Sequence, residues 1–149
     1  MIAVLDYGSQ FSHLIARRIR ALGVYAEIFP NATTAAALKN KKVEGIILSG
    51  GPRSVYENNA PTIDKSIFVL GVPILGVCYG HQLLAHVLGG KVVPSSKEYG
   101  KETLTVVKKS QLLHGLGKKE QVWMSHGDSV VRLPQGFTLS GSTPDCKIA

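Results

Sequence analysis

Short apolar runs alternate with amphipathic helical stripes through residues 2–88 of the chain. Strands are predicted at residues 2–6, 24–29, 45–48 and 74–77, and helices at residues 11–22, 33–39, 62–70 and after Cys78. Each helix returns the chain to the same end of the sheet, so consecutive strands run parallel. We therefore predict an α/β fold with an open, mostly parallel sheet flanked by helices, of the flavodoxin-like kind.

The pattern changes after Lys91, where short β-like runs are predicted at residues 103–107, 121–124 and 137–140. Residues 146–149 predict the start of a further strand, with no terminal helix or polar tail after it. No linker-like stretch separates this part from the rest. We therefore expect one domain over residues 1–149, incomplete at its C-terminus, with a strand-rich C-terminal extension.

The net charge of +7 raises the question of nucleic-acid binding. The basic residues are dispersed, however, and no aromatic residues interleave with them as a base-stacking platform requires. A solvated basic face is the favoured interpretation, and nucleic acid remains a minor alternative. Two cysteines, no signal peptide and no apolar stretch long enough to span a bilayer predict a soluble, cytoplasmic protein without a membrane partner.

A cysteine stands between two glycines in residues 76–80, where the last predicted strand runs into a helix. This G-x-C-x-G pattern is typical of a thiol nucleophile elbow. The turn is too sharp for a side chain on either flank, which explains Gly76 and Gly80. The helix N-terminus favours the thiolate, the reactive form of the side chain. We predict that Cys78 is a nucleophile; a buried structural cysteine is the alternative.

Attack by a thiolate on a carbonyl creates an oxyanion, which needs preorganised N–H donors. The N–H of Tyr79 is one predicted donor, and Gly50 or Gly51 is predicted to give the second. A plain Gly-Gly-Pro turn is the alternative for this glycine pair. The loop also resembles that of ATP pyrophosphatases, but Pro52 removes an N–H and Arg53 stands where those proteins carry Asp. No metal-binding, nucleotide-binding or redox motif is present, so no metal or cofactor is predicted.

A cysteine nucleophile normally has a histidine base. His81 and His86 lie on the elbow helix and are expected to point along it, away from the sulfur. His13 on the first helix and His114 in a turn are expected to be solvated. His126, in a Ser-His-Gly-Asp loop after a strand, is the most site-like, with a satisfied loop histidine as the alternative. The sequence assigns no base to Cys78.

Four segments together resemble the class I glutamine amidotransferase family, and within it most closely the glutaminase domain of GMP synthetases. The resemblance runs from Val4 to Ala149. The elbow by itself matches only the broad family, and the other three segments narrow the resemblance to the GMP synthetase type. The four segments are residues 5–10, 48–52, 76–82 and 123–128.

The resemblance implies that Cys78 attacks the side-chain amide of L-glutamine, releasing ammonia and leaving a thioester that water hydrolyses to glutamate. It implies an oxyanion hole from Tyr79 and a glycine of the Gly50-Gly51 pair. It further implies that ammonia passes to an ATP-pyrophosphatase domain or subunit that aminates XMP to GMP, where ATP and Mg²⁺ would bind. The residues implied to hold the glutamine head group are Gln82, Ser125, His126, Gly127 and Asp128.

The chain departs from the family pattern in one respect, because it contains no His-Pro-Glu segment, where the family carries its catalytic His and Glu. Impaired glutamine hydrolysis by these residues is therefore expected. Two alternatives remain open. One is another class I amidotransferase or a γ-glutamyl hydrolase, and the other is a catalytically silent binding or regulatory module of the same fold.

Overall fold

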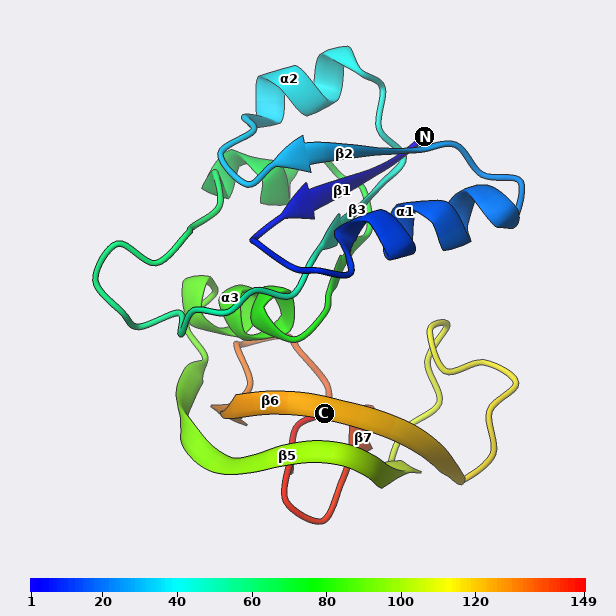
Figure 1. Cartoon of the computed structure of the whole chain (residues 1–149), viewed down its shortest axis with the longest axis vertical. Coiled ribbons are helices and arrows are strands. Elements are labelled where there is room, and N and C mark those ends of the chain that lie inside the picture. The colour runs from blue at the N-terminus through cyan, green and yellow to red at the C-terminus, as the bar shows by residue number, and fades with distance from the viewer. The chain divides into compact units, whose positions relative to one another are not determined.

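The computed structural model describes the backbone of all 149 residues and the side chains of all but Ser96 and Lys97. The chain forms two compact units, Met1–Leu84 and Ala85–Ala149, each built on its own sheet (Figure 1). Helix α3 (Tyr79–Val87) leads from the first unit into the second.

The first unit contains a four-stranded parallel sheet in the order β2-β1-β3-β4. The predicted α/β architecture is therefore confirmed, and two strands have the predicted bounds. Its strands are β1 (Ile2–Asp6), β2 (Ala26–Pro30), β3 (Gly45–Leu48) and β4 (Ile74–Gly76). Its other helical elements are α1 (Ser12–Ala21), α2 (Ala35–Asn40) and the 3₁₀ helix η1 (Lys65–Val69).

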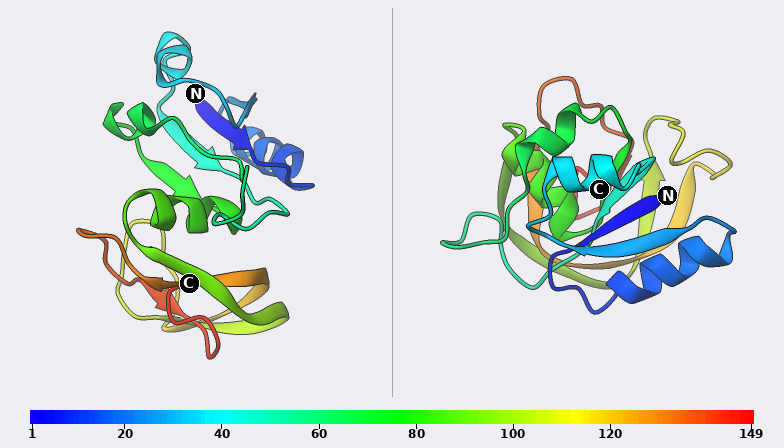
Figure 2. Two further views of the ribbon diagram at one scale, coloured as in Figure 1. Left: turned by 90° about the vertical axis from the view of Figure 1, so that its left-hand side faces the viewer. Right: turned by 90° about the horizontal axis from the view of Figure 1, so that it is seen from above.

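Helix α1 packs along β1 and β2 (Figure 2). Its inner face carries Ala16, Ile15 and Ile19, which belong to one apolar cluster with the buried Val4 of β1 and Ala26 of β2. The predicted apolar stripe is longer than the observed one, because Phe11 and Leu22 are the cap residues and are 57% and 82% exposed. The buried face of the helix therefore covers two turns.

Several predicted elements in the first unit begin later than expected, including α2, which begins at Ala35 and not at Thr33. The strand predicted from Val24 begins at Ala26, because the Val24 N–H still closes the end of α1 by donating to the Ile19 carbonyl at 3.3 Å. The helix predicted at residues 62–70 is only the 3₁₀ helix η1. Its N-cap, Asp64, accepts the Ser66 N–H at 2.9 Å, so only five residues remain before the chain turns.

The second unit is a three-stranded antiparallel sheet in the order β6-β5-β7. Its strands are β5 (Lys91–Val106), β6 (Lys119–Arg132) and β7 (Gly141–Ser142). The predicted strand-rich extension is confirmed, with strands much longer than expected in β5 and β6. The register shifts between Pro94, which pairs with Asp128, and Glu98, which pairs with His126. This irregularity bends the ladder next to Gly127.

The strands predicted at residues 137–140 and 146–149 are wrong. Strand pairing begins only at Gly141, which pairs with Val106, and residues 137–140 have no strand assignment. The last residues form a turn in which the Thr143 N–H donates to the Cys146 carbonyl at 2.8 Å. The Ala149 N–H donates to the Gly141 carbonyl of β7 at 3.1 Å, but this single bond does not make residues 146–149 a strand.

Within the part of the chain that the structure describes, every helix is too short or too polar to span a membrane.

Candidate active site

Cys78 occupies the junction between β4, which ends at Gly76, and α3, which begins at Tyr79. Its φ angle is 51°, in the left-handed region that side-chain-bearing residues seldom adopt. Its carbonyl accepts the Gln82 N–H at 3.0 Å, so the first helical turn starts on the cysteine itself. The thiol-bearing residue is half-buried. The predicted sharp turn from strand to helix is confirmed.

Both flanking glycines are required by close backbone contacts. A Cβ on Gly76 would lie 2.5 Å from the carbonyl of Gly80, and a Cβ on Gly80 would lie 2.3 Å from the carbonyl oxygen of Leu48. The Gly80 N–H also donates to the Ser49 carbonyl at 3.1 Å, and the Val77 N–H donates to the Leu48 carbonyl at 3.0 Å. The start of α3 is therefore held against the end of β3 with no space for a methyl group.

The Gly50-Gly51 loop lies beside the cysteine. A Cβ on Gly50 would be 3.6 Å from the Cβ of Cys78. The buried Ser49 hydroxyl shapes this loop, since it accepts the Tyr7 N–H at 3.0 Å and donates to the Gly50 carbonyl at 2.8 Å. The structure thus brings Gly50 next to Cys78, which Tyr79 directly follows. Their role as oxyanion donors stays a prediction.

Tyr79 anchors the elbow through its side chain, which is 1% exposed. Its hydroxyl donates to the Pro61 carbonyl, and its ring centroid lies 5.5 Å from that of Tyr7. Burial raises the pKa of both phenols above the ordinary value. Because the phenol is protonated and already bonded, any contribution of Tyr79 to oxyanion binding comes from its backbone N–H.

Asp6 organises the loop that follows β1. Its Oδ1 accepts the Gly8 N–H at 2.9 Å, the Ser9 N–H at 3.2 Å and the Ser12 hydroxyl at 2.8 Å. Burial by itself would raise the pKa of this carboxyl, but these hydrogen bonds outweigh it and hold the pKa below its ordinary value. The loops after β1, β3 and β4 all lie at the carboxyl ends of neighbouring parallel strands, where ligand sites gather in such sheets.

The predicted head-group residues lie in different settings. Gln82 is on α3 and is 5% exposed. Ser125, His126, Gly127 and Asp128 lie within strand β6, so the loop predicted there is wrong. Long-range pairing with β5 extends the strand through these polar residues, which propensity does not predict. Trp123, two residues before Ser125, is 79% exposed.

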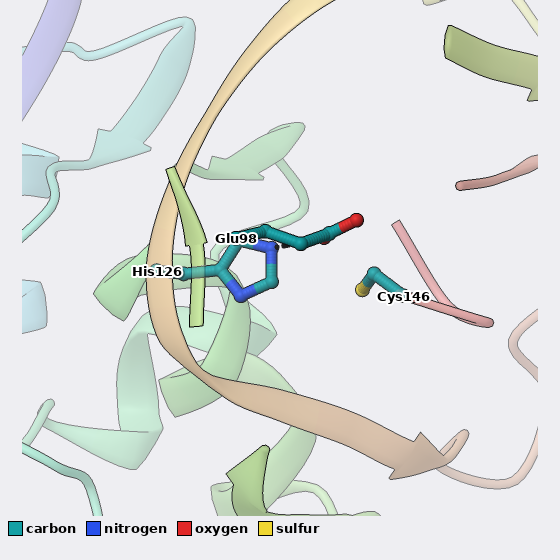
Figure 3. Close-up of side chains that lie close together, drawn as sticks. All are labelled: Glu98, His126 and Cys146. Carbon is teal, nitrogen blue, oxygen red and sulfur yellow. Dashed lines mark ion pairs between the residues drawn. The ribbon is translucent and has the colours of Figure 1, made fainter. Parts of the chain in front are cut away.

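The expectations for His13 and His114 are confirmed, and the orientation expected of His81 and His86 stays a prediction. His13 and His114 are exposed, as predicted, and His81 and His86 lie on α3, with His86 exposed. The His126 side chain is only 10% exposed and lies against Glu98, with Nε2 2.9 Å from Oε2 (Figure 3).

Sequence reasoning missed several residues that shape these sites. Ser49 had one detectable signal, namely its position at the end of a buried strand just before two glycines. Glu98, Thr143 and Cys146 had none, because the fold brings them to His126 from distant segments.

Comparison with protein families supports the resemblance. The family model for class I glutamine amidotransferases matches residues 3–149. The chain is 52% identical over 150 residues to the glutamine-hydrolyzing GMP synthase of Geobacillus kaustophilus, and 48% identical over 149 residues to that of Syntrophomonas wolfei. The match covers 100% and 99% of this chain, and the chain spans only 29% of the length of each of these curated relatives.

Solved structures agree with the sequence comparison. A Thermoplasma acidophilum protein, described as a candidate GMP synthase subunit, superimposes with a TM-score of 0.82 at 33% identity, over 99% of this chain and 74% of that one. A glutamine amidotransferase from Thermotoga maritima shares the fold, with a TM-score of 0.73 at 18% identity over 99% of this chain and 68% of that one.

Proposed function

The chain belongs to the class I glutamine amidotransferase family, and we propose that it acts as the glutaminase part of a GMP synthase, with Cys78 as the nucleophile. The observation that carries this proposal is the conformation of Cys78. A non-glycine residue is held at φ 51° between two glycines that tolerate no Cβ. Strain of this kind is kept where it serves a function, here presentation of the sulfur at the N-terminus of α3.

In the proposed reaction, the Cys78 thiolate attacks the side-chain amide carbon of L-glutamine and forms a C–S bond. The C–N bond then breaks, and the amide nitrogen leaves as ammonia after taking up a proton. Water attacks the thioester, which releases glutamate and the thiol. The backbone N–H groups of Tyr79 and of Gly50 or Gly51 stabilise the oxyanion in both steps. Neither step needs a cofactor.

Glutamine recognition is proposed for Gln82 and the Ser125, His126, Gly127 and Asp128 segment. The His126 imidazole is turned toward Glu98 within the second unit, which favours the backbone of this segment as the substrate contact.

A glutamine analogue that carries a chloroketone in place of the amide tests the proposal. We expect one adduct per chain, mapped by mass spectrometry to Cys78, and slower labelling in the presence of L-glutamine. The Cys78→Ala variant should form no adduct whose formation L-glutamine slows. Labelling confined to Cys146, or labelling of Cys78 that glutamine does not slow, would contradict the proposal.

The role in GMP synthesis is a proposal for the whole protein, supported by the names of the relatives and by the 29% of their length that the chain spans. The ammonia would aminate XMP in an ATP- and Mg²⁺-dependent synthetase part. The test is a full-length protein assay with two nitrogen sources. Cys78→Ala should abolish glutamine-dependent GMP formation and keep formation from added ammonium salt. Loss of both activities, or of neither, would argue against this division of labour.

A further inference from the structure

Glu98, His126 and Cys146 bring their side chains together in the second unit (Figure 3). One carboxylate oxygen, one ring nitrogen and the sulfur all lie within 4.8 Å of one another. Glu98 and His126 are paired across β5 and β6, and Cys146 comes from the turn after β7. Thr143 ties that turn to the cluster, since its hydroxyl donates to Glu98 Oε1 at 2.7 Å and accepts the Cys146 N–H at 2.9 Å.

The cluster is buried and incompletely satisfied. The side chains of Glu98 and His126 are 3% and 10% exposed, and Cys146 is 4% exposed. Glu98 Oε2 and His126 Nε2 lie 2.9 Å apart, close enough for an ion pair, yet their geometry is not that of a hydrogen bond. These two atoms and His126 Nδ1 have no hydrogen-bond partner among the residues whose side chains the structure describes. Buried polar atoms in this state need an explanation, and a bound ion is one that also accounts for the nearby sulfur.

A cysteine, a histidine and a carboxylate could also form a nucleophilic triad. The state of Cys146 argues against that interpretation. Burial raises the pKa of its thiol, and the S–H group donates to the Ile148 carbonyl at 3.1 Å. A buried, protonated thiol is not the reactive form and is out of reach of a substrate.

We propose that Glu98, His126 and Cys146 form a binding site for one Zn²⁺ ion. Sulfur, imidazole nitrogen and carboxylate oxygen are the three donor types that Zn²⁺ takes in proteins, at about 2.0–2.3 Å. Tetrahedral ligation at such lengths places the ligand atoms about 3.3–3.8 Å apart, so the observed separations require small side-chain movements. A sulfur donor selects against Mg²⁺ and Ca²⁺, which prefer oxygen ligands.

Neighbouring hydroxyl groups orient two of the three ligands. The Thr143 hydroxyl hydrogen-bonds Glu98 Oε1, and the other carboxylate oxygen, Oε2, faces His126. The Ser129 hydroxyl hydrogen-bonds the Cys146 sulfur. Contacts of this kind fix ligand direction in metal sites. The ligands are spread over residues 98–146 in no recognised spacing, which is why the sequence predicted no metal.

Zn²⁺ in this site would join β5, β6 and the turn after β7, with a water molecule as its fourth ligand. Its proposed role is to stabilise the second unit, which does not depend on the chemistry of Cys78. The 149-residue chain, treated with a chelator, can be titrated with Zn²⁺ against a chromogenic competitor and with Co²⁺ as a spectroscopic probe. We expect one equivalent of either metal per chain, and a thiolate-to-cobalt charge-transfer band with Co²⁺.

Two variants test proposed ligands, and a third serves as the control. Cys146→Ser should abolish the charge-transfer band and weaken Zn²⁺ binding more than about 100-fold, and Glu98→Gln should weaken it at least about 10-fold. Cys78→Ser, which changes the other cysteine, should bind as the wild type does. Circular dichroism of each variant checks its fold, and the Co²⁺ spectrum of the wild type decides sulfur ligation even where a variant does not fold.

Three results would overturn the proposal: less than stoichiometric binding, a Co²⁺ complex without sulfur ligation, or a charge-transfer band that Cys78→Ser abolishes and Cys146→Ser keeps. Each would leave the cluster as a Glu–His ion pair beside a buried thiol.

Discussion

Substitution of Gly80 by alanine tests how tightly the elbow is built. The new Cβ would lie 2.3 Å from the carbonyl oxygen of Leu48 and 2.6 Å from its Cβ, whereas ordinary contact begins near 3.4 Å. The oxygen belongs to the backbone of the buried strand β3, so it cannot swing aside as a flexible side chain would. Helix α3 must therefore move away from β3 by about 1 Å.

That movement weakens two hydrogen bonds, from the Gly80 N–H to the Ser49 carbonyl and from the Val77 N–H to the Leu48 carbonyl. Each contributes about 1 kcal/mol, and forced overpacking adds about 1–3 kcal/mol. Alanine is a better helix former than glycine by about 1 kcal/mol, which offsets part of the loss. We expect Gly80→Ala to lower the free energy of unfolding by about 2–4 kcal/mol.

The assay is urea unfolding followed by far-ultraviolet circular dichroism. Gly23→Ala is the control in the same unit, because its Cβ meets nothing within 4 Å and only its φ of +79° is strained. The free energy of unfolding of the control should fall by about 1 kcal/mol. If Gly80→Ala is no less stable than Gly23→Ala, the close contact between α3 and β3 is not rigid. The claim that this contact requires a glycine at position 80 would then be wrong.

Substitutions at three further positions give separable outcomes. Thr143→Val removes the donor to the buried Glu98 carboxylate and should lower the free energy of unfolding by about 1.5–3 kcal/mol in chemical denaturation, whereas Thr143→Ser should keep most of it. The pKa of Asp6 is lowered in the folded state, so its stabilisation is complete well above its ordinary pKa of 3.8 and is lost as pH falls through the lower folded value. Asp6→Asn should therefore make melting temperature less sensitive to pH below about 4, and an unchanged acid profile would contradict the assignment. Tyr79→Phe removes the hydrogen bond to the Pro61 carbonyl and should lower the free energy of unfolding by about 1 kcal/mol. Its Cys78 should still react with the chloroketone at the wild-type rate, because the predicted oxyanion donor is the Tyr79 backbone N–H. A large loss of labelling rate would point to the phenol instead.

The first unit was largely predictable because its signals are local. Strands β1 and β3 are short apolar runs that begin and end within the sequence pattern, and both have their predicted bounds. The elbow was predictable for the same reason, since Gly76 and Gly80 are only four residues apart and both indicate the sharp turn at Cys78. Cap interactions, such as the Val24 N–H at the end of α1, displaced other boundaries by two residues.

The second unit was less predictable because pairing partners determine its strands. The extension of β6 through Ser125 and Asp128 depends on β5, and the start of β7 at Gly141 depends on its pairing with Val106 of β5. Neither cause can be detected in a window of neighbouring residues. The contact of Glu98 with His126 follows from the same ladder, so no sequence pattern pointed to it.

The left-handed backbone at Cys78 sets stability against function at a single position. Holding a residue with a side chain at φ 51° costs about 1–2 kcal/mol, a cost that glycine avoids. Glycine loses more conformational entropy on folding, by about 0.4–1 kcal/mol. Cys78→Gly should therefore fold at least as stably as the wild type, although it carries no thiol. The backbone term by itself favours glycine here, so the reason for a cysteine at this position lies in its side chain.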